Sequence, residues 1–175
     1  INREWANGDR VELTLPMSLS MRTWQVNKNS VSVDYGPLTL SLKIAEKYVE
    51  KDSRETAIGD SKWQKGADSK KWPTTEIYPD SPWNYSLVLD KREPLKNFKV
   101  IRKSWPADNY PFTATSVPLE VKAIGRPVPE WKIDETGLCG VLPEEDAMKG
   151  DKEEITLIPM GAARLRISAF PNTKE

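Results

Sequence analysis

The chain has no histidine and only one cysteine among its 175 residues. Histidine is the commonest general base and the commonest metal ligand in proteins, so its absence weighs against an enzyme. One cysteine excludes an internal disulfide and any metal site built from several cysteines of this chain. We therefore expect no catalytic residue, no cofactor and no metal within these residues.

Net charge and long apolar runs are lacking too. The 26 basic residues balance the 26 acidic ones, so no net field attracts nucleic acid or an anionic membrane. No apolar run approaches the length of a membrane span, and no secretory leader is recognisable. We expect neither partner. The chain begins at Ile1 without an initiator methionine, which indicates a processed chain or a fragment of a larger protein.

Alternating apolar residues are the dominant local pattern, and a period of two predicts β-strands with one buried face. The pattern is clearest in residues 30–44, where the apolar positions change from odd to even at Gly36-Pro37. A bend or a turn at that point would restore a common face. It would bring five side chains into one core: Val31, Val33, Leu38, Leu40 and Leu42.

Further strands are expected between proline and glycine turns. The first covers residues 10–15, with Val11, Leu13 and Leu15 facing inward. The last two would pair as a C-terminal hairpin. The remaining ranges are 18–24, 83–89, 98–101 and 118–124, followed by the hairpin strands 154–158 and 163–170.

Residues 45–82 have dense charge and no apolar period, so we expect an irregular insertion with little helix, held in place by its tryptophans. Many short strands and no long helical pattern predict an all-β fold. The expected architecture is an antiparallel β-sandwich of jelly-roll type. Residues 1–175 would form one domain, with the insertion 45–82 inside it.

Acidic residues gather around Trp131 and in the run from Glu144 to Asp146. Glycoside hydrolysis requires two carboxylates, one of them with a raised pKa. Acids in polar loops are more typical of solvated surface, which is our interpretation of these: Glu130, Asp134, Glu135, Glu144, Glu145 and Asp146. Cys139 has no histidine to activate it, so we interpret it as a small buried apolar residue.

Tryptophan is abundant, with seven residues. Indole rings stack on sugars, suit protein interfaces and fill β cores, and the sequence leaves these three roles open. The candidates for sugar binding or interdomain contact are Trp63, Trp72, Trp83, Trp105 and Trp131.

Three segments together resemble a known family. They read NREWANGDRVELTLPMSLSMRTW, SVSVDYGPLTLSLKI and ITLIPMGAARLRISAFP. They are similar to the C-terminal β-sandwich region of glycoside hydrolase family 127, the β-L-arabinofuranosidase group and its relatives, common in Bacteroidetes. The resemblance covers nearly the whole chain.

In that family a zinc-bound cysteine nucleophile lies in an N-terminal (α/α)6 barrel. No catalytic or zinc-binding residue carries over to this chain. The resemblance therefore implies a non-catalytic domain of an enzyme of plant-polysaccharide degradation, packed on its own barrel and located in the periplasm or outside the cell. Isolated, such a domain would expose an apolar patch. The alternative is a carbohydrate-binding module that uses exposed tryptophans; a free-standing enzyme ranks third.

Overall fold

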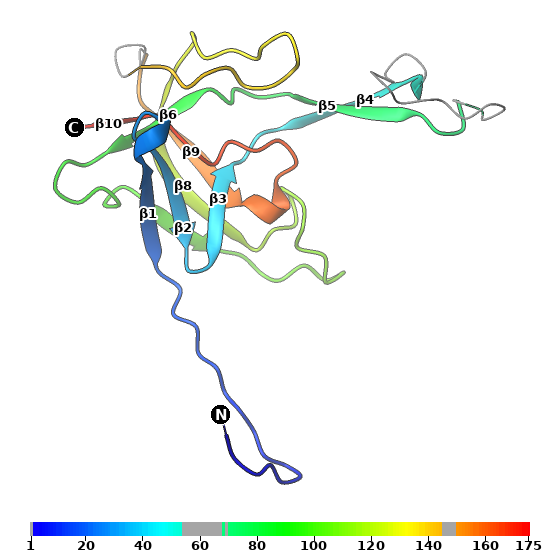
Figure 1. The fold of residues 1–175 in the computed structure, drawn as a ribbon, viewed down its shortest axis with the longest axis vertical. Coiled ribbons are helices and arrows are strands. Elements are labelled where there is room, and N and C mark those ends of the chain that lie inside the picture. The colour runs from blue at the N-terminus through cyan, green and yellow to red at the C-terminus, as the bar shows by residue number, and fades with distance from the viewer. Residues whose placement is uncertain (1, 54–67, 69, 145–149) are drawn as a thin grey trace.

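The computed structural model describes residues 2–53, 68, 70–144 and 150–175 (Figure 1). Strands make up most of its regular structure, which confirms the predicted all-β class. Two short 3-10 turns, η1 (Gln25–Asn27) and η3 (Met160–Ala162), accompany them. The strands are β1 (Leu19–Trp24), β2 (Ser30–Tyr35), β3 (Leu38–Leu42), β4 (Glu46–Lys51), β5 (Thr74–Pro79), β6 (Tyr85–Leu89), β7 (Lys99–Arg102), β8 (Leu119–Pro127), β9 (Glu153–Pro159) and β10 (Asn172–Lys174).

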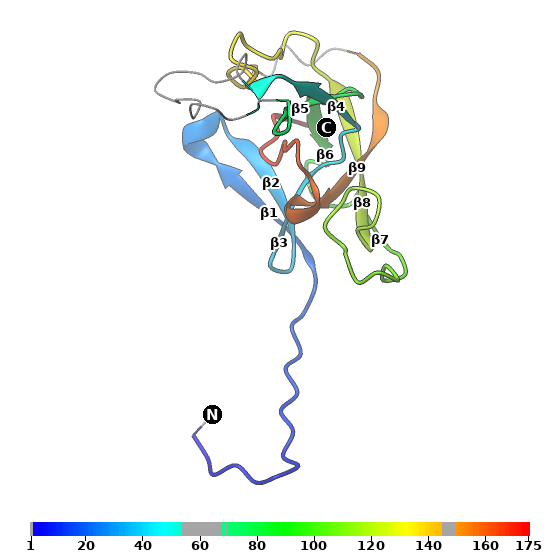
Figure 2. The same ribbon diagram turned by 90° about the vertical axis from the view of Figure 1, so that its right-hand side faces the viewer.

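One curled, mixed sheet forms the body of the molecule (Figure 2). Its strands follow the order β1-β2-β3-β9-β8-β6-β10, and β7 also pairs with β8. β10 runs parallel to β6, whereas the other pairs are antiparallel. The curl encloses an apolar core in which Leu40, Leu87, Leu157 and Phe170 are fully buried. Within the described ranges, no helix has the length and hydropathy that a bilayer span requires.

Gly36 and Pro37 form a tight turn that joins β2 to β3. Gly36 has a φ of 56°, and a Cβ atom there would overlap the Sδ atom of Met17, so the position favours glycine. The predicted core is largely confirmed. Val31, Val33, Leu40 and Leu42 are buried, but Leu38, at the start of β3, is 38% exposed.

The strand predicted at residues 10–15 is wrong. Residues 10–17, which we call the arm, extend away from the sheet beyond the start of β1 (Figures 1 and 2). Val11, Leu13 and Leu15 are 59%, 77% and 61% exposed instead of facing the core. The physical reason is the length of the neighbouring strand. β2 ends at Tyr35 opposite Leu19, and the chain then turns at Gly36.

The insertion is more regular than predicted. Its two flanks, β4 and β5, pair as a separate two-stranded antiparallel sheet that projects sideways from the body (Figure 1). The residues of β4 and β5 show no apolar period because both faces of the ribbon are partly exposed. Pairs of polar side chains link the two strands. Lys51, for example, forms an ion pair with Glu76 at 2.6 Å. Residues 54–67 and 69 lie outside the described residues.

The predicted C-terminal hairpin is also wrong. β9 is present, but η3 follows it, and residues 163–171 then cross to β2 instead of pairing with β9. The Leu42 amide donates to the Ile167 carbonyl at 2.9 Å, and Phe170 forms a β-bridge with Val31. Ile167 and Phe170 are buried there, so core packing decides the path of this segment.

Candidate interaction surface

The antiparallel registers place several strand ends at one end of the sheet. Leu19, where β1 begins, is opposite Tyr35, where β2 ends, and Arg102 at the end of β7 is opposite Leu119 at the start of β8. β9 ends beside the beginning of β3. The arm, the β2–β3 turn, η3 and the β7–β8 connection (residues 103–118) therefore leave the sheet together, as both views show (Figures 1 and 2). We call these four segments the arm end.

Nine of the 18 large apolar side chains that are exposed among the described residues lie at the arm end. Single exposed apolar residues are common on proteins, but a concentration of them marks a contact surface. Trp105 is 62% exposed and Phe112 is 58% exposed, in addition to the three arm residues. The full set is Val11, Leu13, Leu15, Met17, Leu38, Trp105, Tyr110, Phe112 and Met160.

The β7–β8 connection holds its aromatic side chains outward by local contacts. The indole N–H of Trp105 donates to the Oδ1 atom of Asn109 at 2.6 Å, and Asn109 adopts a left-handed φ of 56°. The rings of Tyr110 and Phe112 meet edge to face, with centroids 5.5 Å apart. These contacts lie within the connection, so the rings have partners there without being buried in the core.

A carboxylate between two lysines fixes the base of this connection. The Glu120 side chain is only 9% exposed, and its Oε1 atom lies 2.7 Å from Lys43 Nζ and 2.6 Å from Lys103 Nζ. Burial acts to raise the Glu120 pKa, but hydrogen bonds from Lys103 and Lys43 outweigh it and hold that pKa below its usual value. Glu120 is thus a charged anchor, which makes it unsuited to donate a proton at neutral pH.

A second network holds β1 at the base of the arm. Arg22 on β1 donates from Nε and Nη2 to the two carboxylate oxygens of Asp34 on β2, at 2.7 and 2.9 Å. The Thr39 hydroxyl of β3 donates to the same carboxylate at 2.8 Å. Burial acts to raise the Asp34 pKa, but the hydrogen bonds from Arg22 and Thr39 leave it lowered. The arm therefore extends from a firmly held strand.

The five candidate tryptophans lie in different environments. Trp131 is buried, and its indole N–H donates to the Gly140 carbonyl at 2.9 Å. Trp83 is partly buried and meets Trp131 edge to face, with centroids 5.2 Å apart. Trp72, just before β5, is 73% exposed, and Trp105 is exposed at the arm end. Trp63 lies outside the described residues.

Trp83 also lines a groove of about 760 Å³. The groove lies between the β4–β5 ribbon, the loop 133–139 and the segment 164–167, and its polar walls include Arg166 and Asp134. The Asp134 carboxylate accepts hydrogen bonds from the Thr136 hydroxyl and from the backbone amides of Thr136 and Leu138, which lower its pKa. It is therefore a turn-forming group and a poor proton donor.

The other acidic residues agree with solvated surface where the structure describes them. Glu130, Asp134, Glu135 and Glu144 are exposed, and Glu144 forms an ion pair with Lys28 at 2.5 Å. Glu145 and Asp146 lie outside the described residues. Among the residues that are described, no group of three or more potential metal ligands occurs.

The prediction that Cys139 is buried is wrong. Its side chain is exposed at the rim of the groove. The loop around it folds on itself through a β-bridge between Ile133 and Cys139 instead of packing on the core, which explains the exposure.

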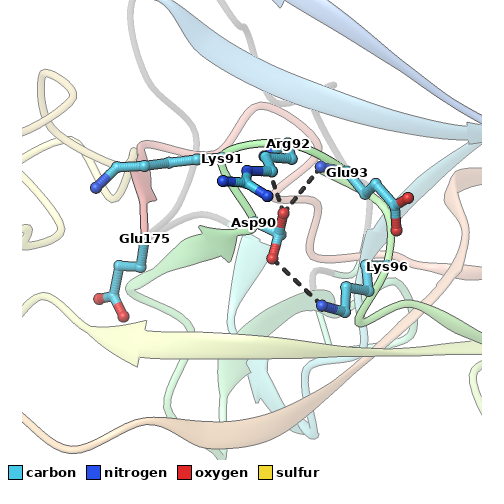
Figure 3. Close-up of a pocket in the computed structure, with 6 residues that line it drawn as sticks. All are labelled: Asp90, Lys91, Arg92, Glu93, Lys96 and Glu175. Carbon is cyan, nitrogen blue, oxygen red and sulfur yellow. Dashed lines mark hydrogen bonds and ion pairs between the residues drawn. The ribbon is translucent and has the colours of Figure 1, made fainter.

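A second pocket, of about 500 Å³, follows β6 (Figure 3). Asp90 is its central side chain, and its carboxylate accepts hydrogen bonds from the Glu93 and Arg92 amides at 2.8 and 2.9 Å. These bonds lower the Asp90 pKa. Lys96 Nζ approaches the same carboxylate at 3.7 Å (Figure 3). The Asp90 carboxylate is therefore occupied in stabilising a turn.

Sequence reasoning missed the arm as a surface feature. The available signal was that the odd-numbered apolar positions continue without a phase change from the arm into β1, which indicates one long strand but not which part of it is paired. Comparisons of the chain with protein families, with curated proteins and with solved structures found no match in any of the three.

Proposed function

We propose that this chain is a non-catalytic β domain that packs, through its arm end, against the catalytic domain of a glycoside hydrolase related to the β-L-arabinofuranosidase group. The observation that carries the proposal is the concentration of exposed apolar side chains at one end of the sheet. The motif resemblance supplies the identity of the partner, an (α/α)6 barrel that holds the zinc and the reacting cysteine.

The free energy of burial supports a permanent partner. Covering one exposed leucine or valine stabilises a contact by about 1.5–3 kcal/mol, before ordering costs are subtracted. Leu13 and Leu15 are more than half exposed, as are Trp105 and Phe112 of the neighbouring connection. Together these side chains offer the central apolar cluster that a stable interface requires.

We propose that strands from the polypeptide around this chain, rather than from the helical barrel, pair at the arm end. They would complete the curled sheet and convert it into a two-layer β-sandwich in the whole protein. The domain then serves as a rigid support that shapes or shields the entrance to the active site. Its location would follow that of the enzyme, in the periplasm or outside the cell, where plant polysaccharides are met.

The complete reading frame of the gene provides the first test. We expect it to encode helical repeats and a cysteine cluster on the N-terminal side of this domain. Deleting residues 10–17 from that complete protein should release or destabilise the catalytic domain, measured by gel filtration and by glycosidase activity. A reading frame that encodes no helical repeats and no cysteine cluster would overturn the proposal.

The groove beside Trp83 favours a second candidate, carbohydrate binding. The partly buried Trp83 and the ring of Tyr78 offer apolar surface, and Arg166 and Glu135 offer hydrogen bonds, the combination that sugar sites use. The charged residues of the groove are balanced, with three acids (Glu76, Asp134, Glu135) and three bases (Lys51, Arg164, Arg166), which suits a neutral sugar.

Calorimetry of the chain against arabinose-containing oligosaccharides separates the two candidates. The interdomain role predicts no heat of binding. Millimolar or tighter binding that is lost in Tyr78→Ala and Arg166→Ala, but kept in Trp105→Ala at the arm end, would establish the groove as a sugar site instead. These variants leave Trp83 in place, because its removal would disturb the packing of the buried Trp131.

A further inference from the structure

The arm is the unpaired part of one continuous strand. From residue 11 to residue 21 the odd positions are all apolar, whereas the even positions are polar or proline. The later part of this run, from Leu19 onward, is paired with β2, and Leu19 and Met21 pack on the core. Residues 10–17 have the same pattern, with no strand beside them among the described residues.

A turn at the tip of the arm reverses the chain. The Asp9 amide donates to the Ala6 carbonyl at 3.1 Å, and the Ala6 amide donates to the Asp9 carboxylate at 2.9 Å. Gly8 supplies the left-handed φ of 95° that such a turn needs. Arg3 Nη2 then reaches back to Asp9 Oδ2 at 2.8 Å. The chain before the turn thus runs in the opposite direction to the arm (Figure 1).

We propose that residues 10–17 are the second strand of a β-hairpin whose first strand is the polypeptide on the N-terminal side of Trp5. The inference rests on the proposed function, because it requires that the parent protein continue before Ile1. In this hairpin the first strand runs antiparallel to the arm and supplies the backbone partners that the arm lacks.

The pattern of the arm specifies the chemistry of that first strand. Before Ile1 it must present apolar side chains at alternate positions, on the face that carries Leu15, and polar side chains on the face that carries Arg10 and Glu12. Pro16 has no N–H group, so it cannot donate a backbone hydrogen bond to the first strand. From Leu19 onward the chain pairs with β2. The completed hairpin and β1 then form one extended edge of the sheet.

A second copy of the chain is the competing occupant. Two arms could pair antiparallel, since a run of alternating apolar residues is self-complementary. The turn argues against this, because Arg3 and Asp9 are bonded across it and keep the preceding chain reversed relative to the arm. A second copy would have to take the place of that chain.

Amide hydrogen exchange followed by mass spectrometry tests the proposal. The 175-residue chain is compared with a chain extended by about ten of the natural residues that precede Ile1, the length of a long strand. We expect exchange in residues 10–17 to be at least about tenfold slower in the extended chain. An extension of the same composition in scrambled order should give no protection.

Two glycines provide matched variants of the extended chain. Gly8 and Gly137 have φ values of 95° and 83°, and both have open space around them. Gly8→Val should abolish the protection of the arm, whereas Gly137→Val should preserve it. Unchanged exchange with the natural extension would overturn the hairpin, as would protection in the 175-residue chain that rises with protein concentration. A reading frame without helical repeats would refute the proposed function but leave this result unaffected.

Discussion

The arm and β2 have the same sequence pattern and opposite environments. Both alternate apolar and polar residues, yet Val31 and Val33 of β2 are 2% and 0% exposed, whereas Leu13 of the arm is 77% exposed. β2 is flanked by β1 on one side and by β3 and Phe170 on the other. Alternation therefore determines which face of a strand is apolar, while the presence of neighbouring strands determines whether that face is buried.

Truncating a leucine should give the largest difference in the free energy of unfolding between the core of the sheet and the arm. Leu40→Ala removes a fully buried side chain and should lower the free energy of unfolding by about 3 kcal/mol. Leu13→Ala on the arm should change it by less than about 0.5 kcal/mol, because the side chain is solvated. Urea unfolding of the two variants measures both. Equal destabilisation would show that the arm is packed in solution.

The Glu120 network should give the next largest effect. Glu120→Gln should cost about 2 kcal/mol, because two lysines lose their charged partner near the core. Since the folded pKa of Glu120 is lowered, its contribution is fully present above the unfolded pKa and is lost as pH falls through the folded value.

Denaturation at several pH values checks this sign. The wild-type chain should lose stability on acidification, and Glu120→Gln should lose less over the same interval. Glu154→Gln is the matched control, since Glu154 is 60% exposed and pairs only with Lys122 among the described residues. A similar loss in Glu154→Gln would contradict the special role of Glu120.

Variants of the β2–β3 turn test the contact between the last residue of the arm and the sheet. Gly36→Ala should cost about 1–2 kcal/mol, because alanine is strained at a positive φ and its Cβ atom would collide with Met17. Met17→Ala should relieve the steric part, so the double variant should be more stable than additivity predicts. Gly161→Ala, which meets open space, should be nearly neutral. Thermal unfolding distinguishes these results.

Substitutions in the arm should have the smallest effect on stability but a clear effect on the exposed apolar area. Leu13→Lys combined with Leu15→Lys should leave the melting temperature within about 2 °C of wild type. Binding of an apolar dye should fall, because the exposed apolar area shrinks. A large drop in melting temperature would mean that these residues contribute to the core.

Local alternation predicted the strands well where both neighbours lie within the chain. Val31, Val33 and Leu42 were placed correctly because alternate burial and the break at Gly36-Pro37 are local signals. The arm was predicted inward because nothing local reports the absence of a partner strand.

Two other differences arise from long-range packing. Phe170 forms a β-bridge with Val31 of β2, which is far from it in sequence. No local pattern could therefore indicate that residues 163–171 leave β9. β4 and β5 are held by polar pairs such as Lys51 and Glu76, which give no apolar period. To recognise the arm end as one surface, the strand registers must be known, and sequence alone does not supply them.

Hydroxyl-radical footprinting tests the central claim most directly. The 175-residue chain is compared with the complete protein, with Trp105, Tyr110 and Met17 as reporters at the arm end and Trp72 beside β5 as the control. We predict that oxidation of the three reporters falls severalfold in the complete protein while oxidation of Trp72 is unchanged. Equal oxidation of the arm-end reporters in both proteins would contradict the account.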